Sequence, residues 1–238
     1  IFERLAYEGQ KWTNFYAAFP TCTRSRAALL TGRLPIRIKR GDGKERLKLV
    51  FPDHVHGMHG DEITIAEMLK ESGYATAAVG KWHLGHSPKL LPSARGYERT
   101  VALADSGADN WEQKPYLPIY EQANWFADGE RFELPDDFYS SRFLVDKIIE
   151  FIDSNSGSKA PFFAYLPFQA VHIPVQAPQS FIDRYDGKYD EGWEVLRSRR
   201  HKAAQALGLV PENSAMEPMA STESWQNLEP KTKRYQAK

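Results

Sequence analysis

Cys22 is the residue of this chain whose type and surroundings point most directly to chemistry, and it is the only cysteine among 238 residues. A lone cysteine cannot form an intrachain disulfide, so it is either a packed thiol or a reactive group. The residues at 25–30 are typical of the first turns of a helix, and Gly32 suits the left-handed residue that ends one. We therefore expect Cys22 at, or just before, a helix N-terminus.

A helix N-terminus favours negative charge, because its amide groups and its dipole point toward the preceding residues. Arg26 follows Cys22 by four residues and lies on the same face if the helix already includes Cys22. The segment thus predicts an anion site that contains a reactive side chain. The alternative interpretation is a buried, inert cysteine that packs like any small apolar residue.

Two further groups of cationic and titratable side chains each come directly after a predicted strand. Lys81 and His83 follow the apolar run 74–79, and His172 follows the predicted buried strand 161–166. In open α/β sheets, ligands bind beyond the carboxyl ends of the strands, so these side chains could converge with the helix near Cys22. An arginine, a lysine and two histidines together suit a doubly charged oxyanion.

The segments that must position these residues alternate between strand-like and helix-like patterns, which predicts an α/β fold. We expect helices at 2–8, 64–73, 139–155, 193–207 and from 231 onward, strands at 13–19, 74–79 and 161–166, and a hairpin turn at 128–130. The segment 41–60 reads as a polar surface excursion, and 87–135 shows little periodicity. The chain begins and ends within predicted helices, which suggests a fragment of a longer protein.

Two of the predicted helices have a clear apolar face. A capping box at Thr64 opens one of them, in which Ile65, Met68 and Leu69 form the apolar face. The helix at 139–155 is expected to bury four side chains, namely Leu144, Ile148, Phe151 and Ile152. Both helices are therefore expected to pack against the sheet.

The composition argues against several classes of partner. Lysine plus arginine equals aspartate plus glutamate at 31 each, so the formal net charge is zero. A neutral chain is not suited to nucleic-acid binding through phosphate contacts, nor to attraction by an anionic membrane. The sequence contains no apolar run long enough for a transmembrane helix. We expect neither a nucleic acid nor a membrane as partner.

Three separated motifs resemble the signatures of the type I sulfatases, which are enzymes of the alkaline-phosphatase-like superfamily. The segment 22–33 resembles the signature Cys-x-Pro-Ser-Arg-x-x-x-x-Thr-Gly, with Arg24 in place of its proline, and 73–83 resembles the second signature without departure. The segment 161–174 is similar to a third family segment, and 185–193 with 207–211 is similar to bacterial and fungal arylsulfatases. The resemblance implies a mixed sheet between helices, with residues 1–238 as the central part of one catalytic domain that lacks its first strand and C-terminal part.

The resemblance also implies roles for five residues. Cys22 would be oxidised by the formylglycine-generating enzyme and would attack a small-molecule sulfate ester as the aldehyde hydrate. Arg26 and Lys81 would hold its oxygens, and His83 would be the base for sulfate release. His172, with Lys81, would bind the sulfate group, and the histidine could protonate the leaving group. The family is calcium-dependent and periplasmic or secreted; only Cys22, as formylglycine, would contact Ca²⁺ from this segment.

Two other functions fit the same residues. A phosphoester or phosphonate hydrolase of the same superfamily would use a similar oxyanion site. A non-catalytic, sulfatase-like binding protein is the second alternative, because Arg24 replaces the proline that the maturation enzyme reads. Rates on paired aryl sulfate and aryl phosphate substrates would separate the two enzymes.

Several other groups of residues have a structural interpretation beside a functional one. His54, His56 and His59 could bind a transition metal or simply line a polar loop, and the pair Asp136–Asp137 could bind a metal or favour the following helix start. The basic run 197–202 suits a solvated helix face. Trp82 could stack on substrate or pack beside the site, and Asp105, Asp109 and Asn110 could contact substrate.

Overall fold

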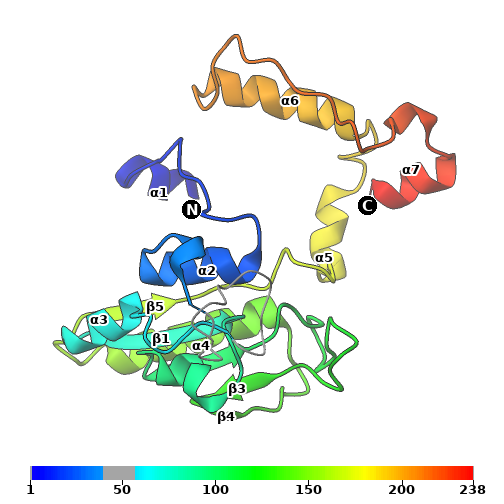
Figure 1. Ribbon diagram of the computed structural model, residues 1–238. Helices are drawn as coiled ribbons and strands as arrows, with labels where there is room; N and C mark the ends of the chain where they lie inside the picture. The colour runs from blue at the N-terminus through cyan, green and yellow to red at the C-terminus, as the bar shows by residue number, and fades with distance from the viewer. Residues whose placement is uncertain (1, 40–56, 238) are drawn as a thin grey trace. The chain divides into compact units, whose positions relative to one another are not determined.

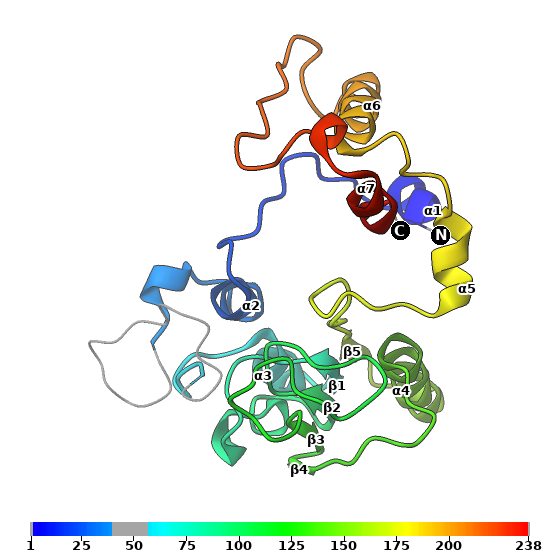
Figure 2. The ribbon, with the colours of Figure 1, turned by 90° about the vertical axis from the view of Figure 1, so that its right-hand side faces the viewer.

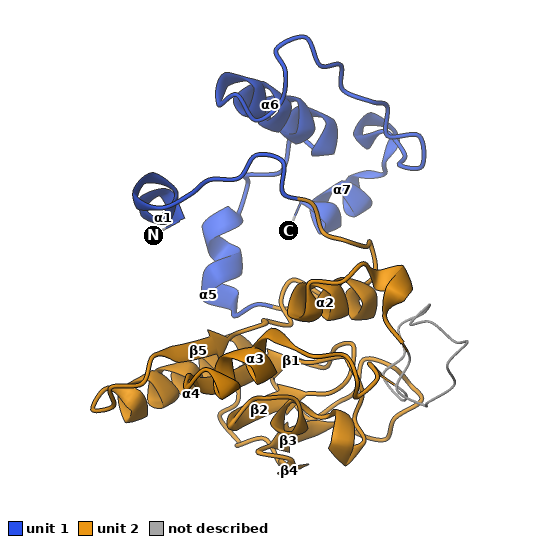
Figure 3. Ribbon diagram, turned by 60° about the vertical axis from the view of Figure 1, so that its left-hand side comes forward, with its two compact units in different colours: residues 1–15, 177–238 blue, residues 16–176 orange. Residues whose placement is uncertain are grey.

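The computed structural model describes residues 2–39 and 57–237, which form two compact units. One unit comprises residues 16–176, and the other comprises residues 1–15 together with 177–238 (Figure 3). Cys22, Arg26, Lys81, His83 and His172 all belong to the unit 16–176. The architecture that positions the candidate site is therefore that of this unit alone.

A five-stranded mixed sheet forms the centre of the unit 16–176 (Figure 1). Its strands are β1 (Ala75–Lys81), β2 (Arg99–Leu103), β3 (Trp125–Ala127), β4 (Glu130–Arg131) and β5 (Phe162–Tyr165), in the order β4-β3-β2-β1-β5. The strand β1 pairs in parallel with both β2 and β5, whereas β3 runs antiparallel to β2 and to β4. Parallel pairing places the carboxyl ends of β1, β2 and β5 at the same edge of the sheet.

Helices cover both faces of the sheet, as the alternation of side chains along the strands requires (Figure 2). On β1, Ala78 packs with residues of α2 (Cys22–Thr31) and α3 (Ile65–Glu71), while Ala77 and Val79 pack against α4 (Ser140–Asn155). The same alternation continues on β2 and β5. The predicted mixed sheet between helices is thus confirmed.

The second unit contains α1 (Phe2–Glu8), α5 (Gln179–Ile182), α6 (Trp193–Ala206) and α7 (Pro230–Gln236). The described part of the two units also contains short 3-10 helices at Pro35–Arg37, Pro88–Leu90, Pro92–Ala94, Asp183–Tyr185 and Trp225–Asn227. In the second unit Trp193 and Trp225 meet edge to face at 4.9 Å, and Glu194 accepts a hydrogen bond from the Trp225 amide at 2.9 Å. None of the helices in the described ranges has the length and apolar character needed to cross a membrane.

The predictions for local elements are confirmed where short-range patterns determine them. The capping box of Thr64 and Glu67 is present, and the hairpin turn at 128–130 joins β3 to β4. The helix α4 buries Leu144, Ile148 and Phe151, with Ile152 partly buried against the same cluster. The helices predicted at 2–8, at 193–207 and from 231 onward correspond to α1, α6 and α7.

Four expectations are wrong because contacts distant in sequence decide them. The predicted strand at 13–19 is irregular and largely exposed, since no strand pairs with it in the part of the chain described. The irregular region 87–135 contains the strand β2, whose interior is buried between β1 and β3. The strand at 161–166 is not buried: β5 lies at the edge of the described sheet, and Phe162 is 44% exposed. In α3 it is Ala66 that packs inward, while Ile65 and Met68 are exposed.

Most of the predicted surface excursion at 41–60 lies outside the described residues, including His54 and His56. Its last part is not a surface segment, because Gly57 and Met58 are buried. The Met58 amide donates a hydrogen bond to the Leu84 carbonyl at 3.0 Å, just beyond β1. This segment therefore packs against the chain that follows the central strand.

Gly80 allows the chain after β5 to approach the end of β1. Its φ is +131°, and a Cβ there would lie 2.3 Å from the Pro167 carbonyl oxygen. We expect Gly80→Ala to lower the free energy of unfolding by about 3 kcal/mol, because it combines backbone strain with a clash against backbone. Gly73→Ala is the matched control: its φ is +84° but nothing lies within 4 Å of the added Cβ. Gly73→Ala should lower the free energy of unfolding by only about 1 kcal/mol. Denaturant titration of both variants measures these values, and equal losses of stability would contradict the close-approach argument.

Candidate active site

The helix α2 begins at Cys22, as its sequence predicts. Thr21 is its extended N-cap residue, and the Ser25 amide closes the first helical ring on the Thr21 carbonyl at 3.1 Å. Gly32 ends the helix with a left-handed φ of 65°, and its amide bonds to the Ala28 carbonyl at 2.9 Å. Cys22 is a half-buried free thiol, so it lies where the helix dipole favours an anion.

Arg26 joins the start of α2 to the ends of two parallel strands. Its guanidinium donates a hydrogen bond of 2.7 Å to the Lys81 carbonyl, the last residue of β1. It donates a second bond of 3.2 Å to the hydroxyl of Tyr165, the last residue of β5. The guanidinium is thus held by both strand ends and holds the first turn of α2 against them. The sequence does not point to Tyr165, because nothing in an apolar strand indicates which hydroxyl an arginine will contact.

Lys81 is the buried cation of the site. Its residue is only 3% exposed, and its side chain lies close enough to Cys22 for the two to interact electrostatically. Burial lowers the pKa of Lys81 from 10.5 to about 8, with a further lowering by the positive charge of Arg26, which the contact with Cys22 only partly offsets. A buried ammonium whose charge is poorly compensated favours an anionic partner beside it. Cys22, Arg26 and Lys81 therefore form one contiguous group.

His83 is buried just beyond the end of β1, two residues after Lys81. Its φ of 56° is in the left-handed region, which a non-glycine residue adopts at a cost and which is frequent at functional sites. The Trp82 amide bonds to the Leu103 carbonyl at 2.8 Å, so the chain continues the β1–β2 ladder for one residue before it turns. The structure places His83 at the predicted edge of the sheet.

His172 lies on the loop 166–178 that follows β5, and it is half-exposed. Its Nδ1 lies 2.7 Å from the Ile173 carbonyl, and its ring meets the Tyr116 ring edge to face at 5.3 Å. A carbonyl oxygen can only accept, so the proton of the neutral ring belongs on Nδ1 and Nε2 is the nitrogen that can gain or lose a proton. Over residues 2–39 and 57–237, no hydrogen bond or ring contact joins His172 to Cys22, Arg26 or Lys81.

Arg24, which occupies the position of the family proline, packs its guanidinium over the Phe19 ring at 4.1 Å. Arg24 is the third residue of α2, so its amide is among those that precede the first intrahelical hydrogen bond. The cation–π contact is worth about 0.5 to 1 kcal/mol at a partly exposed position. The arginine thus contacts the segment before the helix and leaves the hydrogen bonds of α2 unchanged.

The other candidates have structural roles. Trp82 is 2% exposed and donates its indole N–H to the Leu90 carbonyl at 2.8 Å. Its burial favours packing beside the site over stacking on a substrate. Asp136 and Asp137 are both exposed before α4. His59 lies 3.4 Å from the Asp61 carboxylate, whereas its two predicted partners are outside the described residues. Where side chains are described, no three histidine, cysteine or carboxylate groups cluster as a metal site.

The three polar residues after β2 bind other parts of the protein. Asp105 accepts hydrogen bonds from the amide and side chain of Asn124, at 2.8 and 3.0 Å. Asp109 and Asn110 bond to glutamine side chains on the loop that carries His172. A polar run alone could not have indicated these contacts within the protein.

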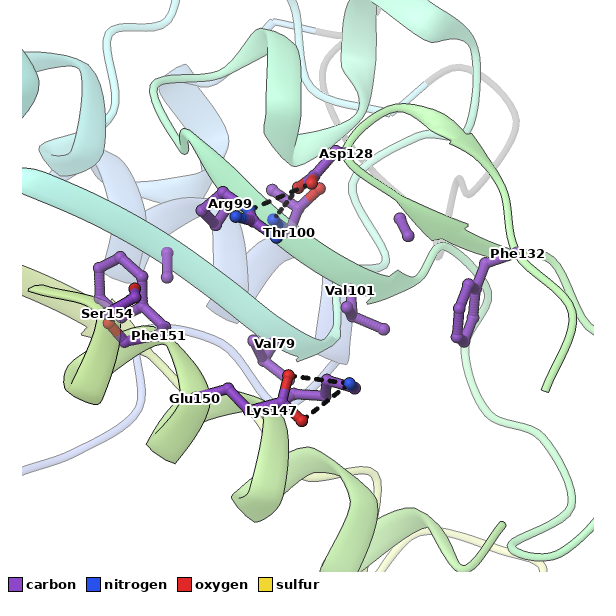
Figure 4. Close-up of a pocket in the computed structure, with 12 residues that line it drawn as sticks. Val79, Arg99, Thr100, Val101, Asp128, Phe132, Lys147, Glu150, Phe151 and Ser154 are labelled. Carbon is purple, nitrogen blue, oxygen red and sulfur yellow. Dashed lines mark hydrogen bonds and ion pairs between the residues drawn. The ribbon is translucent and has the colours of Figure 1, made fainter. Parts of the chain in front are cut away.

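A cavity of about 360 Å³ lies on the α4 side of the sheet (Figure 4). Apolar side chains of β1, β2 and α4 form part of its wall, including Val79, Val101 and Phe151. Its charged side chains are paired, Arg99 with Asp128 at 3.2 Å and Lys147 with Glu150 at 2.9 Å. None of the five predicted site residues lines it. The cavity therefore lacks an uncompensated cation for oxyanion chemistry.

The group around Cys22 has the properties that transfer of a charged oxyanion requires. Cys22 lies at a helix N-terminus, beside a buried lysine and an arginine whose position two strands determine. Such preorganised cations stabilise negative charge that develops on a transferring group. The same edge of the sheet carries His83 and, after β5, the loop of His172.

Known proteins resemble the chain over nearly all of its length. The chain is 35% identical to an uncharacterized sulfatase of Schizosaccharomyces pombe over 99% of the chain and 45% of the relative. It is 31% identical to an arylsulfatase of Klebsiella aerogenes over 99% of the chain and 51% of that enzyme. The chain thus spans about half the length of these curated relatives.

The fold and the family model agree with these relatives. The crystal structure of Ps i-CgsB in complex with k-i-k-neocarrahexaose matches with a TM-score of 0.59 and 28% identity, over 71% of this chain and 39% of that one. The structural neighbours of the chain are sulfatases of the alkaline-phosphatase-like fold. The sulfatase family model matches residues 1–221. The chain therefore belongs to the sulfatase family.

Proposed function

We propose that the protein hydrolyses sulfate monoesters of the aryl sulfate or related small organic type, with Cys22 as the precursor of the nucleophile. The observation that carries this proposal is the pair of hydrogen bonds by which Arg26 holds the helix that begins at Cys22 against the ends of β1 and β5, beside the buried Lys81. The sulfatase relatives support the reaction class. The proposed substrate class is the one that the arylsulfatase relative's name indicates.

Oxidation of Cys22 to formylglycine would give an aldehyde whose hydrate carries two hydroxyl groups. In the proposed reaction, one hydroxyl attacks sulfur, the sulfur–oxygen bond of the ester breaks, and the alcohol leaves. The second hydroxyl then loses its proton, the aldehyde re-forms, and sulfate departs. Water that rehydrates the aldehyde completes the hydrolysis, so the net reaction consumes one ester and one water.

The residues of the site would divide the remaining tasks. Lys81 and Arg26 lie where they would hold the oxygens at position 22 and offset the charge of the sulfate group. His83, buried beyond β1, would accept the proton of the second hydroxyl, which suits an imidazole near neutral pH. His172 would bind a sulfate oxygen and, through Nε2, protonate the leaving group.

Calcium is expected for the family, but the described residues do not form a site for it. Among them no cluster of three metal-ligating side chains occurs, and Asp136 and Asp137 are exposed at the start of α4. A hard cation such as Ca²⁺ requires six or more oxygen ligands. The oxygen that formylglycine would provide at position 22 is a single contact, so no step is assigned to the metal.

The proposal for the whole protein follows from the same relatives. Residues 1–238 would form the central part of one catalytic domain in a periplasmic or secreted sulfatase, matured by the formylglycine-generating enzyme. The intact gene product, made in a host with that enzyme, is the sample for the test. We expect a Cys22 peptide lighter than the unmodified thiol peptide, and faster hydrolysis of an aryl sulfate than of the matched aryl phosphate. Unmodified thiol without sulfatase activity would refute the proposal, and a large phosphate preference would indicate a phosphoester hydrolase.

Arg24→Pro is expected to increase the fraction of Cys22 that is converted, because proline is the residue that the maturation signal contains at this position. The change removes the cation–π contact with Phe19 and an amide that precedes the helical hydrogen bonds, so the hydrogen bonds within α2 are kept. Peptide mass spectrometry after co-expression with the maturation enzyme measures the fraction. Arg24→Ala is the control, because it removes the arginine without adding proline. Equal conversion in all three proteins would show that Arg24 does not impair maturation.

A further inference from the structure

The loop that carries His172 is fastened at both ends to two consecutive residues, Asp109 and Asn110. At one end, the Gln169 side chain donates a hydrogen bond of 3.0 Å to Asn110 Oδ1. At the other end, Gln176 Nε2 donates to Asp109 Oδ2 at 2.7 Å. Gln169 and Asn110 are only 4% and 3% exposed, so water competes little for the first of these bonds.

The orientation of the Gln176 amide is determined by its partners. Its Oε1 accepts from the backbone amide of Asn110 at 3.0 Å and from Asn110 Nδ2 at 3.1 Å, while its Nε2 faces the Asp109 carboxylate. A flipped amide would place two donors against each other at Asn110. Burial alone would raise the pKa of Asp109, but hydrogen bonds from Gln176 and from the amides of Trp111 and Glu112 outweigh it and lower the pKa. Asp109 is therefore an anionic acceptor.

His172 lies between the two fastened ends and is restrained in the same way. Its amide donates to the Gln169 carbonyl at 2.8 Å, and its Nδ1 contacts the Ile173 carbonyl at 2.7 Å. A Cβ at Gly107 would lie 3.0 Å from Nδ1, so the segment just before Asp109 packs closely against the imidazole. The place of the ring thus depends on residues 107–110 as well as on its own loop.

We propose that Asp109 and Asn110 are positioning residues for His172, and that they act through Gln176 and Gln169. This inference rests on the proposed function, in which His172 binds sulfate and protonates the leaving group. A misplacement of about 1 Å at a catalytic group can lower a rate about 100-fold, so a loop held at both ends has a direct effect on the reaction. The effect should be largest for esters whose alcohol is a poor leaving group, because these need the proton most.

An exchange of hydrogen-bond polarity tests the contact between Asp109 and Gln176. Gln176→Glu alone puts two carboxylates together, and Asp109→Asn alone puts two donors together. Asp109→Asn combined with Gln176→Glu restores one donor and one acceptor, and the oxygen of the new amide at position 109 can still accept from Trp111 and Glu112. In the intact, matured gene product we expect each single variant to lose about tenfold or more in kcat/KM on an alkyl sulfate. The double variant should return to within about threefold of the natural protein.

Gln113→Ala is the matched control for Gln176→Ala. Gln113 is also a half-buried glutamine that bridges segments, through the Phe132 carbonyl at 3.2 Å and the Leu134 amide at 3.0 Å, but it does not contact the His172 loop. Both variants should lose similar thermal stability. Only Gln176→Ala should lower the rate, and more for an alkyl sulfate than for an aryl sulfate with a good leaving group.

The nuclear magnetic resonance signals of the His172 ring provide a readout that does not require activity. They should shift in the single variants and in Gln176→Ala, return in the double variant, and stay unchanged in Gln113→Ala. Unshifted signals, or a double variant no better than either single variant, would overturn the inference. Inactivity of the natural protein with the expected shifts would refute the proposed function and leave the positioning contacts supported.

Discussion

Replacing Cys22 with alanine is expected to lower kcat/KM for an aryl sulfate by about 10⁴-fold or more in the matured gene product. Alanine has no group that can be oxidised to an aldehyde, so the proposed mechanism would lose both the attacking hydroxyl and the one that later expels sulfate. Arg26 and Lys81 would remain and could still bind sulfate, since Arg26 is held by Lys81 and Tyr165 and not by Cys22. Initial rates at equal enzyme concentration measure the effect.

Two controls separate loss of the nucleophile from loss of structure. Leu29 lies on the same helix and is 61% exposed, so Leu29→Ala should keep the natural rate. The natural sequence made without the maturation enzyme should be as inactive as Cys22→Ala, although its side chains are unchanged. If Cys22→Ala kept more than about a tenth of the natural rate, position 22 would not be the source of the nucleophile.

The parts of the site that sequence could predict are those that short-range rules determine. Cys22 at a helix start follows from the helix pattern and from Gly32, and its contact with Lys81 follows from the rule that parallel strands end at one edge. The capping box at Thr64 is equally local. The proposed roles of these residues come from the family motifs, because neither spacing nor composition determines them.

The parts that sequence could not predict depend on tertiary partners. The strand β2 carries only a short run, Arg99–Leu103, whose interior is buried because β1 and β3 lie on either side of it. Tyr165 looks like any aromatic strand residue until Arg26 is seen to contact it. Asp109 and Asn110 look like exposed loop residues, yet their bonds to Gln176 and Gln169 join segments about 60 residues apart in sequence.

Lys81→Met is expected to reduce activity and to increase stability together. We expect kcat/KM for an aryl sulfate to fall about 100- to 1,000-fold, which is typical when one preorganised donor to a developing anion is removed. Methionine has a similar length and fills the buried space without a charge. Lys147→Met on α4 is the matched control: Lys147 pairs with Glu150 at 2.9 Å, lines the separate cavity, and should leave the rate unchanged.

The stability gain follows from the pKa of Lys81, which is about 8 in the folded protein against 10.5 as its ordinary value. Between these pH values the unfolded chain binds the proton more fully, so the free energy of unfolding of the natural protein rises as pH increases from 8 to 10.5. Below pH 8 the buried charge opposes folding fully. The sample for this test is chelator-treated protein in which Cys22 remains a thiol. In it, Lys81→Met should raise the free energy of unfolding by on the order of 1 to 3 kcal/mol at pH 7, and this gain should shrink above pH 8. A stability loss at pH 7, or a gain that does not vary with pH, would show that Lys81 is not a strained buried cation.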